Sequence, residues 1–455
     1  MKKLILLCFF SSSLLAQNND SIMLRKIYDF YLTESSCYKT LGTMCNTIGA
    51  RLSGSPQAEK SVYFIKKAMY EAGADTVYLQ PCMVTHWVRG DKESCVMTSK
   101  KLDQTKTLNS CVLGGSDGTV ATGITAKVVE VKSFDELEKL GEKVIKGKVV
   151  FYNVAFNPKN LKTGTSYGET VKYRHAGPSK AAKYGAVATV VRSMSSAQND
   201  SPHTGSMNYD TSISKSRIPA FALSFTAADI LAESLKQDAD LTITLKANSK
   251  TLPDVQSYNV IGEVKGTEKP NEYIIAGGHL DSWDLAQGAH DDGAGVVQCI
   301  DALGMFKKMG IKPKHSIRAV AFMNEENGLG GAKAYAKETE EKKWKHIAAI
   351  ETDAGGFTPR AFGVDTITGL YKLAATWKPL FKPYFIENIN SEGGGADIGP
   401  LGKFGVPLIG YEPDGQRYFD LHHTPDDTFD KVNKRELELG AAAIGSLMYL
   451  IDKYK

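Results

Sequence analysis

The sequence predicts an α/β fold in which a mostly parallel sheet carries helices on both faces and receives an inserted α+β segment. From Val260 onward, short apolar runs alternate with helical patterns. Each run is rich in β-branched or small residues, as buried parallel strands are. From about residue 113 to 249 this alternation gives way to strands separated by long Gly- and Ser-rich loops, which predicts the insert.

Three apolar runs predict the centre of the sheet, and two helical patterns predict layers packed against it. The runs at 273–276, 316–323 and 347–350 have the length and composition of buried strands. Apolar residues recur at helical spacing in 295–309 and 435–453. One face of each of these helices is therefore expected in the core.

The N-terminal hundred residues predict helices followed by strands. Residues 21–50 have a mainly helical pattern that is interrupted near Ser35. Ser55 and Pro56 are a favourable helix start, and Gly73 is a favourable stop. Strand-like segments follow from residue 76 to 98.

The insert carries no cluster of metal-ligating or nucleophilic residues. Its predicted strands include 126–131 and 148–154, and a helix at 179–184 runs into a further strand. His175 and His203 are isolated within it. We expect the insert to shape access and contacts, and to be dispensable for metal chemistry but not for substrate handling.

The N-terminus predicts export. Lys2 and Lys3 precede an apolar run, and cleavage after Ala16 would remove a secretory signal. Six cysteines follow it, an even number that permits disulfides without selecting a pairing. With 42% apolar residues, 23% charged residues and a net charge of +4, the composition is globular and does not suggest a nucleic-acid partner. No later run is long enough to span a bilayer.

Carboxylates and imidazoles follow each predicted central strand. They lie where the strand gives way to a loop, and the carboxyl ends of parallel strands form the edge at which α/β sheets bind ligands. One such loop is ordinary, since polar residues are common in turns. Four such polar segments occur in succession, three after these strands and one at 419–428. Together they favour a shared site of imidazole and carboxylate ligands, the set that zinc prefers. The residues concerned are His279, Asp281, His290, Asp291, Asp292, Glu325, Glu326, Glu351, Asp353, His422 and His423.

The order of these motifs resembles the co-catalytic di-zinc aminopeptidase clan. The motifs are His-x-Asp, Asp-Asp-Gly-Ala-Gly, Asn-Glu-Glu, Asp-Ala-Gly and His-Thr-x-x-Asp-Thr. GGHLDSWD, HWVRG at 86–90 and IGARLSGSP at 48–56 resemble the carboxypeptidase Q (plasma glutamate carboxypeptidase) family in particular. The KGKVV and KAAKYGAVATVV segments resemble a protease-associated domain. The resemblance implies a zinc-aminopeptidase-like sheet, with units at 1–16 (signal), 17–112 and 250–455 (catalytic domain) and 113–249 (inserted domain).

The resemblance also implies roles for the site residues and two Zn²⁺ per chain. Asp291 corresponds to the carboxylate that bridges both ions. His279 and Asp353 would complete one ion, and Glu326 and His423 the other.

Two further acidic residues would act beside the ligands. Glu325 corresponds to the general base that takes a proton from water and passes it to the leaving amine. Asp281 is expected to bond the far nitrogen of His279 and to fix its tautomer.

Several alternatives stay open at this point. A shift of one residue would place His290 or His422 in a ligand position. Separately, Glu351 could replace Asp353, although the Asp-Ala-Gly-Gly context favours Asp353. Asp292 is interpreted as a carboxylate at the N-terminus of the following helix. The resemblance further implies a cis peptide bond between Asp291 and Asp292. The remaining histidines are interpreted as ordinary surface or core residues; they are His86, His175, His203, His315 and His346.

The predicted activity is hydrolysis of dipeptides or short peptides with free ends, by an exported, periplasmic or secreted homodimer. Glu392 and Asp397 flank three glycines that include Gly394, and these acids are predicted to bind the substrate's amino group, with His422 also near the substrate. Whether a free carboxyl end is required stays open. Rival readings are a broader aminopeptidase, a non-catalytic receptor-like relative and, disfavoured by the full ligand set, a single-zinc cyclase.

Overall fold

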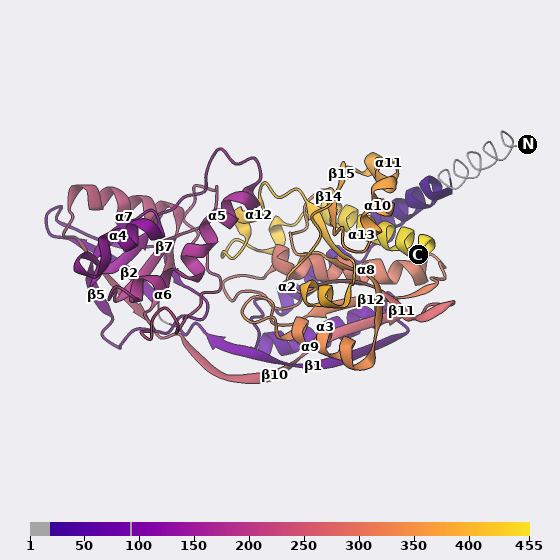
Figure 1. Ribbon diagram of the computed structural model, residues 1–455, viewed down its shortest axis with the longest axis horizontal. Helices are drawn as coiled ribbons and strands as arrows, with labels where there is room; N and C mark the ends of the chain where they lie inside the picture. The colour runs from indigo at the N-terminus through magenta and orange to yellow at the C-terminus, as the bar shows by residue number, and fades with distance from the viewer. Residues whose placement is uncertain (1–18, 92) are drawn as a thin grey trace, which may run out of the picture.

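The computed structural model describes residues 19–91 and 93–455, so the predicted signal at 1–16 lies outside the described residues. The two sheets occupy opposite ends of an elongated molecule, and the long strands β1 (Thr76–Val88) and β10 (Lys250–Val264) connect the ends along one side (Figure 1).

The larger sheet has the order β1-β10-β12-β11-β13-β16-β14-β15. Strand β11 (Lys269–His279) pairs in parallel with β12 (His315–Phe322) and β13 (Lys345–Glu351), and β13 pairs in parallel with β16 (Leu408–Pro413). Toward the edges, β10 pairs antiparallel with both β1 and β12, and β14 (Pro359–Val364) pairs antiparallel with β16. The predicted parallel centre is therefore confirmed, and the three predicted central runs are its strands. The last strand is β15, Asn388–Asn390.

Helices cover both faces of this sheet, as predicted. On one face, Ile274 and Ala276 belong to a core cluster with helices α2 (Cys37–Thr47), α3 (Pro56–Ala72), α8 (Ala294–Lys308) and α13 (Lys434–Tyr454). On the other face, Tyr273 and Ile275 pack in a second cluster with α9 (Gly330–Lys342). Alternate residues of β11 point to opposite faces, so one apolar strand supplies both cores.

Local signals set the helix ends. The Ser55 side chain accepts a hydrogen bond from the Ala58 amide at the start of α3, and Gly73 ends the helix with φ 110°. The helical pattern of 21–50 is interrupted at 35–36, as predicted. There the buried Asp301 carboxylate of α8 accepts hydrogen bonds from the Ser36 and Cys37 amides.

The second sheet begins earlier than the predicted insert. Its order is β3-β2-β9-β5-β6-β7-β8-β4, so the segment from Glu93 to Val112, assigned above to the catalytic part 17–112, belongs to the insert's sheet. The strands of this sheet therefore start before the predicted boundary at 113, because the hairpin β2–β3 pairs through β2 with β9. The predicted end of the insert at 249 lies between β9 and β10. The strands are β2 (Glu93–Ser99), β3 (Gln104–Leu108), β4 (Ser110–Val112), β5 (Ile124–Val131), β6 (Val149–Tyr152), β7 (Ala188–Arg192), β8 (Ala220–Leu223) and β9 (Thr242–Ala247).

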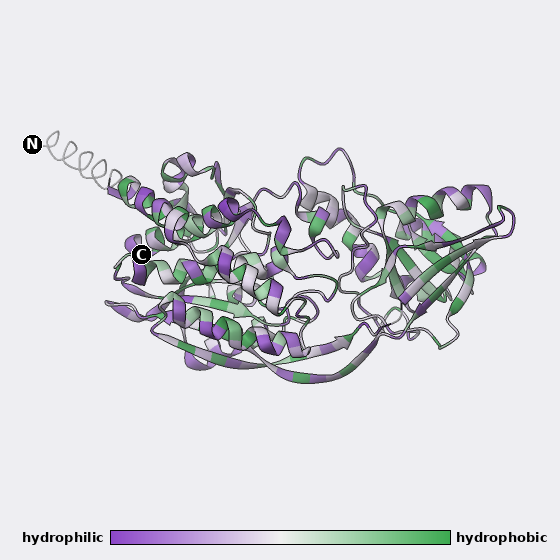
Figure 2. Ribbon diagram, turned by 180° about the vertical axis from the view of Figure 1, so that it is seen from behind, coloured by the Kyte–Doolittle hydropathy of each residue, from purple (hydrophilic) through white to green (hydrophobic). Residues whose placement is uncertain are grey.

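The insert has its own apolar clusters, which Figure 2 shows as hydrophobic segments along its strands. Its helices are α4 (Phe134–Ile145), α5 (Thr163–His175), α6 (Gly177–Ala182) and α7 (Phe225–Gln237). The shorter helices of the catalytic domain are α10 (Leu370–Ala374), α11 (Lys378–Phe381) and α12 (Tyr418–Leu421).

The cysteines of the described chain are all buried free thiols, including Cys299, for which this was predicted. Within the same residues, no helix combines the length and the apolar character that crossing a membrane requires.

Candidate metal centre

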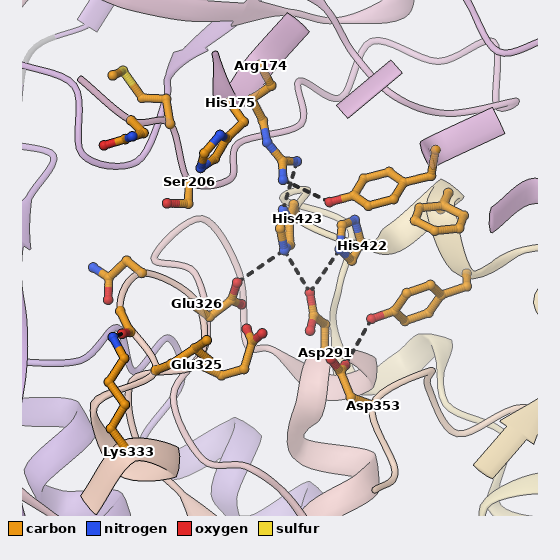
Figure 3. Close-up of a pocket in the computed structure, with 18 residues that line it drawn as sticks. Arg174, His175, Ser206, Asp291, Glu325, Glu326, Lys333, Asp353, His422 and His423 are labelled. Atoms are coloured by element: carbon orange, nitrogen blue, oxygen red, sulfur yellow. Dashed lines mark hydrogen bonds and ion pairs between the residues drawn. The ribbon is translucent and has the colours of Figure 1, made fainter. Parts of the chain in front are cut away.

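The predicted ligands meet at the carboxyl edge of the parallel strands. His279 ends β11, Glu326 follows β12, and Asp353 follows β13. Asp291 lies in the short π-helical turn Ala289–Gly293 before α8, and His423 follows α12. The convergence predicted from four separate loops is what the structure shows (Figure 3).

Asp291 lies between two histidines. Its Oδ1 is 3.2 Å from Nε2 of His279, and its Oδ2 is 3.3 Å from Nε2 of His423. Asp353 Oδ1 lies 3.6 Å from the His279 nitrogen, and Glu326 Oε2 lies 3.1 Å from the His423 nitrogen. Two groups of one imidazole and one carboxylate thus share Asp291, an arrangement that two adjacent metal ions require.

Three polar atoms of the predicted ligands lack hydrogen-bond partners. His279 Nε2, Asp291 Oδ2 and Glu326 Oε1 are buried and make no hydrogen bond. Unpaired buried polar atoms are costly and rare in native proteins. Nitrogen and oxygen donors at these separations fit cations, and each group of potential ligands in the described chain lies at this centre.

The electrostatics also favour a cation. Burial raises the pKa of Glu325 to about 8, and nearby carboxylates add to this shift against the effect of His279. Burial likewise raises the pKa of Asp291, and it raises that of Glu326 well above the usual range. Burial lowers the pKa of His423 well below its ordinary value. Metal ions would oppose the shifts of the carboxyl groups and act in the same direction as that of His423, because they stabilise ionised carboxylates and unprotonated imidazoles.

The alternatives within each motif separate by geometry. The ring of His290 stacks on Phe357, and its Nδ1 accepts from the Gly356 amide. Asp292 accepts from the amides of His279 and Gly295, the latter at the start of α8. The peptide bond before Asp292 is cis, as the resemblance implied.

Glu351 and His422 have different surroundings. The Glu351 carboxylate accepts hydrogen bonds from the three successive amides of residues 396–398, so it holds that loop. The His422 ring stacks on His423, with centroids 3.5 Å apart, and its Nε2 is 3.8 Å from Asp291. His423 therefore lies nearer to Asp291 than His422 does.

Asp281 meets the far nitrogen of His279 through its main chain and not through its carboxylate. The His279 Nδ1 lies 3.0 Å from the backbone carbonyl of Asp281, whereas the carboxylate is 3.9 Å away. The carboxylate instead accepts hydrogen bonds from the amides of Asn324 and Glu325, at 2.7 and 3.1 Å. Because the two residues share a tight turn, the main chain reaches the ring first. Asp281 therefore positions both the histidine and the loop that carries Glu325.

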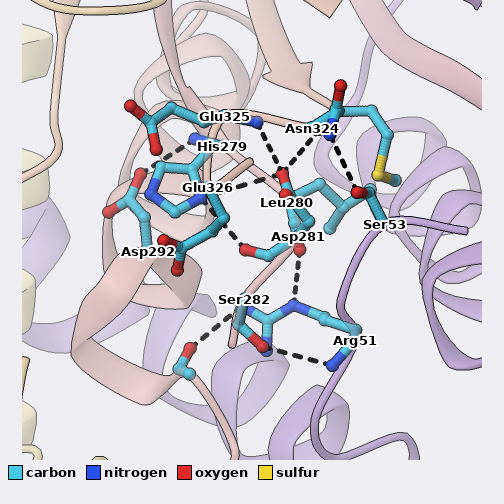
Figure 4. A network of polar contacts seen from close by, with 12 residues as sticks. Arg51, Ser53, His279, Leu280, Asp281, Ser282, Asp292, Asn324, Glu325 and Glu326 are labelled. Carbon is cyan, nitrogen blue, oxygen red and sulfur yellow. Dashed lines mark hydrogen bonds and ion pairs between the residues drawn. The ribbon is translucent and has the colours of Figure 1, made fainter. Parts of the chain in front are cut away.

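Arg51 is a supporting residue for which the sequence analysis predicted no role. Its guanidinium is fully buried and donates to the carbonyls of Leu280, Gln287 and Gly288, which flank the ligand loop (Figure 4). Two residues further on, Ser53 accepts a hydrogen bond from the Asn324 side chain. The 48–56 motif was recognisable by resemblance alone, because its partners lie more than two hundred residues away.

Asp427 is a second such support. Its carboxylate accepts hydrogen bonds from the amides of His290 and Asp291, and burial raises its pKa to about 7. The segment that supplies His423 therefore also fixes the backbone of Asp291.

A cavity of about 840 Å³ opens onto the centre. Glu325 and Asp353 line one side, and Arg174 and His175 of the insert line the opposite side (Figure 3). His175 is thus a wall residue rather than a remote one. The insert contributes Tyr167, Arg174, His175, Ser206, Met207 and Asn208.

Of the residues predicted to bind substrate, His422 lines this cavity. Glu392 is exposed, and its amide bonds the Asn390 side chain. Asp397 is buried with both carboxylate oxygens unpaired, and burial raises its pKa well above the ordinary value. Neither acid nor Gly394 is among the described residues that line the cavity. Recognition of an amino group by this loop stays a prediction without a pocket contact to support it.

Comparison with known proteins identifies the class. Residues 259–448 match the model of peptidase family M28. Carboxypeptidase Q of Mus musculus is 34% identical over 428 residues, which cover 93% of this chain and 87% of that protein. The crystal structure of a peptidase M28 precursor from Shewanella amazonensis SB2B has a TM-score of 0.90 at 31% identity, covering 96% of this chain and 97% of the other.

The chain therefore belongs to peptidase family M28. It is an enzyme of the kind represented by carboxypeptidase Q. A zinc aminopeptidase from Bacillus subtilis has the same fold, with a TM-score of 0.64 at 20% identity over 91% of this chain and 94% of that one.

Replacing Arg51 by methionine should destabilise the protein with or without metal. Three buried carbonyls would lose their donors, and we expect the free energy of unfolding to fall by on the order of 3 kcal/mol. Denaturation by urea after treatment with a chelator would measure the change. Lys60→Met, at an exposed position of α3, is the control. Equal stability of Arg51→Met and the native chain would contradict this role.

Proposed function

We propose that the chain is an exported zinc exopeptidase that hydrolyses dipeptides or short peptides with free termini, using two zinc ions. The observation that supports this most directly is the position of Asp291, with one oxygen toward His279 and the other toward His423. Membership of family M28 supports peptide substrates. Export rests on the predicted signal at 1–16, and a homodimer on the resemblance to the carboxypeptidase Q family.

The residues present fit a pair of zinc ions. His279 and Asp353 would hold one, Glu326 and His423 the other, and Asp291 both. When bound, such a pair supplies positive charge that polarises a peptide carbonyl and makes water more acidic. The unpaired donor atoms of this ligand set support the assignment.

Glu325 is the proposed proton carrier. It lines the cavity beside the proposed ligand Glu326. Among the described residues, the ion pairs of His279 and His423 within 4 Å do not include Glu325. Its carboxylate would accept a proton from the attacking water and deliver it to the nitrogen of the leaving amine. The amide of Glu325 is held by Asp281, so the base occupies a fixed place when substrate arrives.

Arg174 is the proposed partner of the substrate's terminal carboxylate. Its side chain is buried at the wall of the cavity, where it donates to the Tyr167 hydroxyl. Within the described part of the chain no acidic side chain forms an ion pair with it. A buried guanidinium without an acidic partner is unfavourable unless a ligand supplies the negative charge. This favours substrates with a free carboxyl end over the broader aminopeptidase alternative.

Glu325→Gln tests the catalytic role. The variant should retain two zinc ions and lose about 10²- to 10⁴-fold in kcat, because it removes a base and no ligand. Dipeptide turnover together with elemental analysis would measure both quantities. Activity within a few-fold of the native enzyme would disprove the assignment.

Neighbouring acids are matched controls for that experiment. Glu326→Gln should weaken one ion and Asp291→Ala both, since Asp291 alone serves the two. If Asp291→Ala still bound two equivalents, the shared carboxylate would lie elsewhere, and Asp292 would be examined first.

Arg174→Met tests recognition of the carboxyl end. A charge-assisted hydrogen bond contributes about 1.5–3 kcal/mol, so the variant should lose about 10- to 100-fold in the preference for a free dipeptide over its C-terminal amide. The ratio of the two kcat/KM values is the measurement, and Arg174→Lys should retain part of the preference. If the native enzyme cleaves both substrates equally well, the broader aminopeptidase reading replaces this one.

A further inference from the structure

Hydrogen bonds connect the insert to the segment that carries His423. Strand β7 is followed by a loop, residues 193–206, that runs beside residues 418–428 of the catalytic domain. The hydroxyls of Ser195 and Ser196 both lie 3.2 Å from Asp420 Oδ1, and Ser201 bonds the Asp426 carboxylate. Figure 1 shows α5 of the insert next to α12, the helix at the start of this segment.

Within this contact, one residue binds His423 at two points. The amide of Thr204 donates to the His423 carbonyl at 2.9 Å, and the carbonyl of Thr204 lies 3.3 Å from His423 Nδ1. His423 itself has φ 64°. A residue other than glycine adopts this left-handed conformation only where its surroundings hold it there.

The tautomer of His423 follows from its ligand role. If Nε2 faces the centre as a ligand, the ring proton lies on Nδ1, and that nitrogen is a donor. Arg174 Nη1, 3.4 Å from Nδ1, is also a donor and cannot bond it. The carbonyl of Thr204 is then the acceptor for both groups, because Arg174 Nη1 lies 3.3 Å from it.

Thr204 is fixed from its own side of the contact. Its Oγ1 donates to the carbonyl of Val112 at 3.1 Å and accepts from Nη2 of Arg89 at 3.2 Å. Arg89 is in turn paired with both carboxylate oxygens of Asp284, at 2.6 and 2.9 Å. The acceptor that faces the His423 ring is therefore anchored before any metal binds.

We propose that Thr204 is a positioning residue of the metal centre, through which docking of the insert sets the metal affinity of the Glu326–His423 half of the site. The inference rests on the proposed ligand role of His423. It departs from the expectation that the insert is dispensable for metal chemistry. Groups that orient a ligand histidine typically change metal affinity by about 10- to 100-fold.

The test uses full-length Thr204→Gly and Thr204→Ser. Glycine removes both Oγ1 bonds and frees the main chain, whereas serine retains the hydroxyl. Metal-free protein would be titrated with zinc against a competing chelator, and separately with cobalt(II), whose visible absorption reports ligand geometry. We expect Thr204→Gly to bind one of two equivalents about 10-fold or more weakly, with an altered cobalt spectrum, and Thr204→Ser to restore most of the affinity.

Two further variants make the outcome decisive. Thr163→Ala removes a different contact between insert and catalytic domain, the bond from its hydroxyl to the Gly415 carbonyl, and should leave both affinities unchanged. Ser201→Ala loosens the 193–206 loop without touching Thr204 and should weaken the same equivalent, so it carries the test if Thr204→Gly does not fold.

The possible failures are distinguishable. Native affinity of both equivalents in Thr204→Gly and Ser201→Ala, or equal weakening of both, would overturn the positioning role. A native protein that binds no zinc or cobalt in this titration would overturn the proposed metal function, and this inference with it.

Discussion

The carboxylate of Asp291, placed between two histidines, is the constraint on which the rest of the centre depends. One oxygen lies 3.2 Å from His279 and the other 3.3 Å from His423. Neither histidine can therefore move away without losing its contact with Asp291. This geometry requires three chain segments to be held at once. Asp427 holds the amide of Asp291, the carbonyl of Asp281 faces His279, and Thr204 of the insert binds His423. The ligands are few, and their supports come from the whole molecule.

Burial makes this cluster of ionised carboxylates unfavourable in free energy when no cation is bound. The pKa of Glu326 is raised well above its ordinary range, and that of Glu325 to about 8, chiefly by burial. Arg51 is a buried cation beside the ligand loop, and it donates its hydrogen bonds to backbone carbonyls and not to these acids. Arg51 therefore shapes the loop without neutralising the centre, which leaves the positive charge to be supplied by bound ions.

Sequence reasoning predicted the parallel centre of the sheet and named ligand candidates that lie together in the structure, because both follow from local pattern. The ends of strands can be recognised from composition, and His279 and Glu326 each lie a few residues after an apolar run. The choice between His422 and His423 was less secure. Local pattern does not separate the two residues, because His423 takes φ 64° and the two rings stack with their centroids 3.5 Å apart. The membership of β2 in the second sheet was not predicted, because it depends on pairing with β9, a strand far away in the chain.

What the sequence could not provide were contacts between residues far apart in the chain. Arg51 is separated from Leu280 by 229 positions and Thr204 from His423 by 219, and no spacing rule connects either pair. Such supports arise because a ligand histidine has two ring nitrogens, and fixing one for a metal obliges the fold to provide an acceptor for the other. For His279 the acceptor is the carbonyl of Asp281, two residues away on the same loop. For His423 the catalytic domain offers none at that nitrogen in the described contacts, and the insert supplies it. Under the proposed ligand roles, the two halves of the centre would depend on different domains, and movement of the insert would affect them unequally.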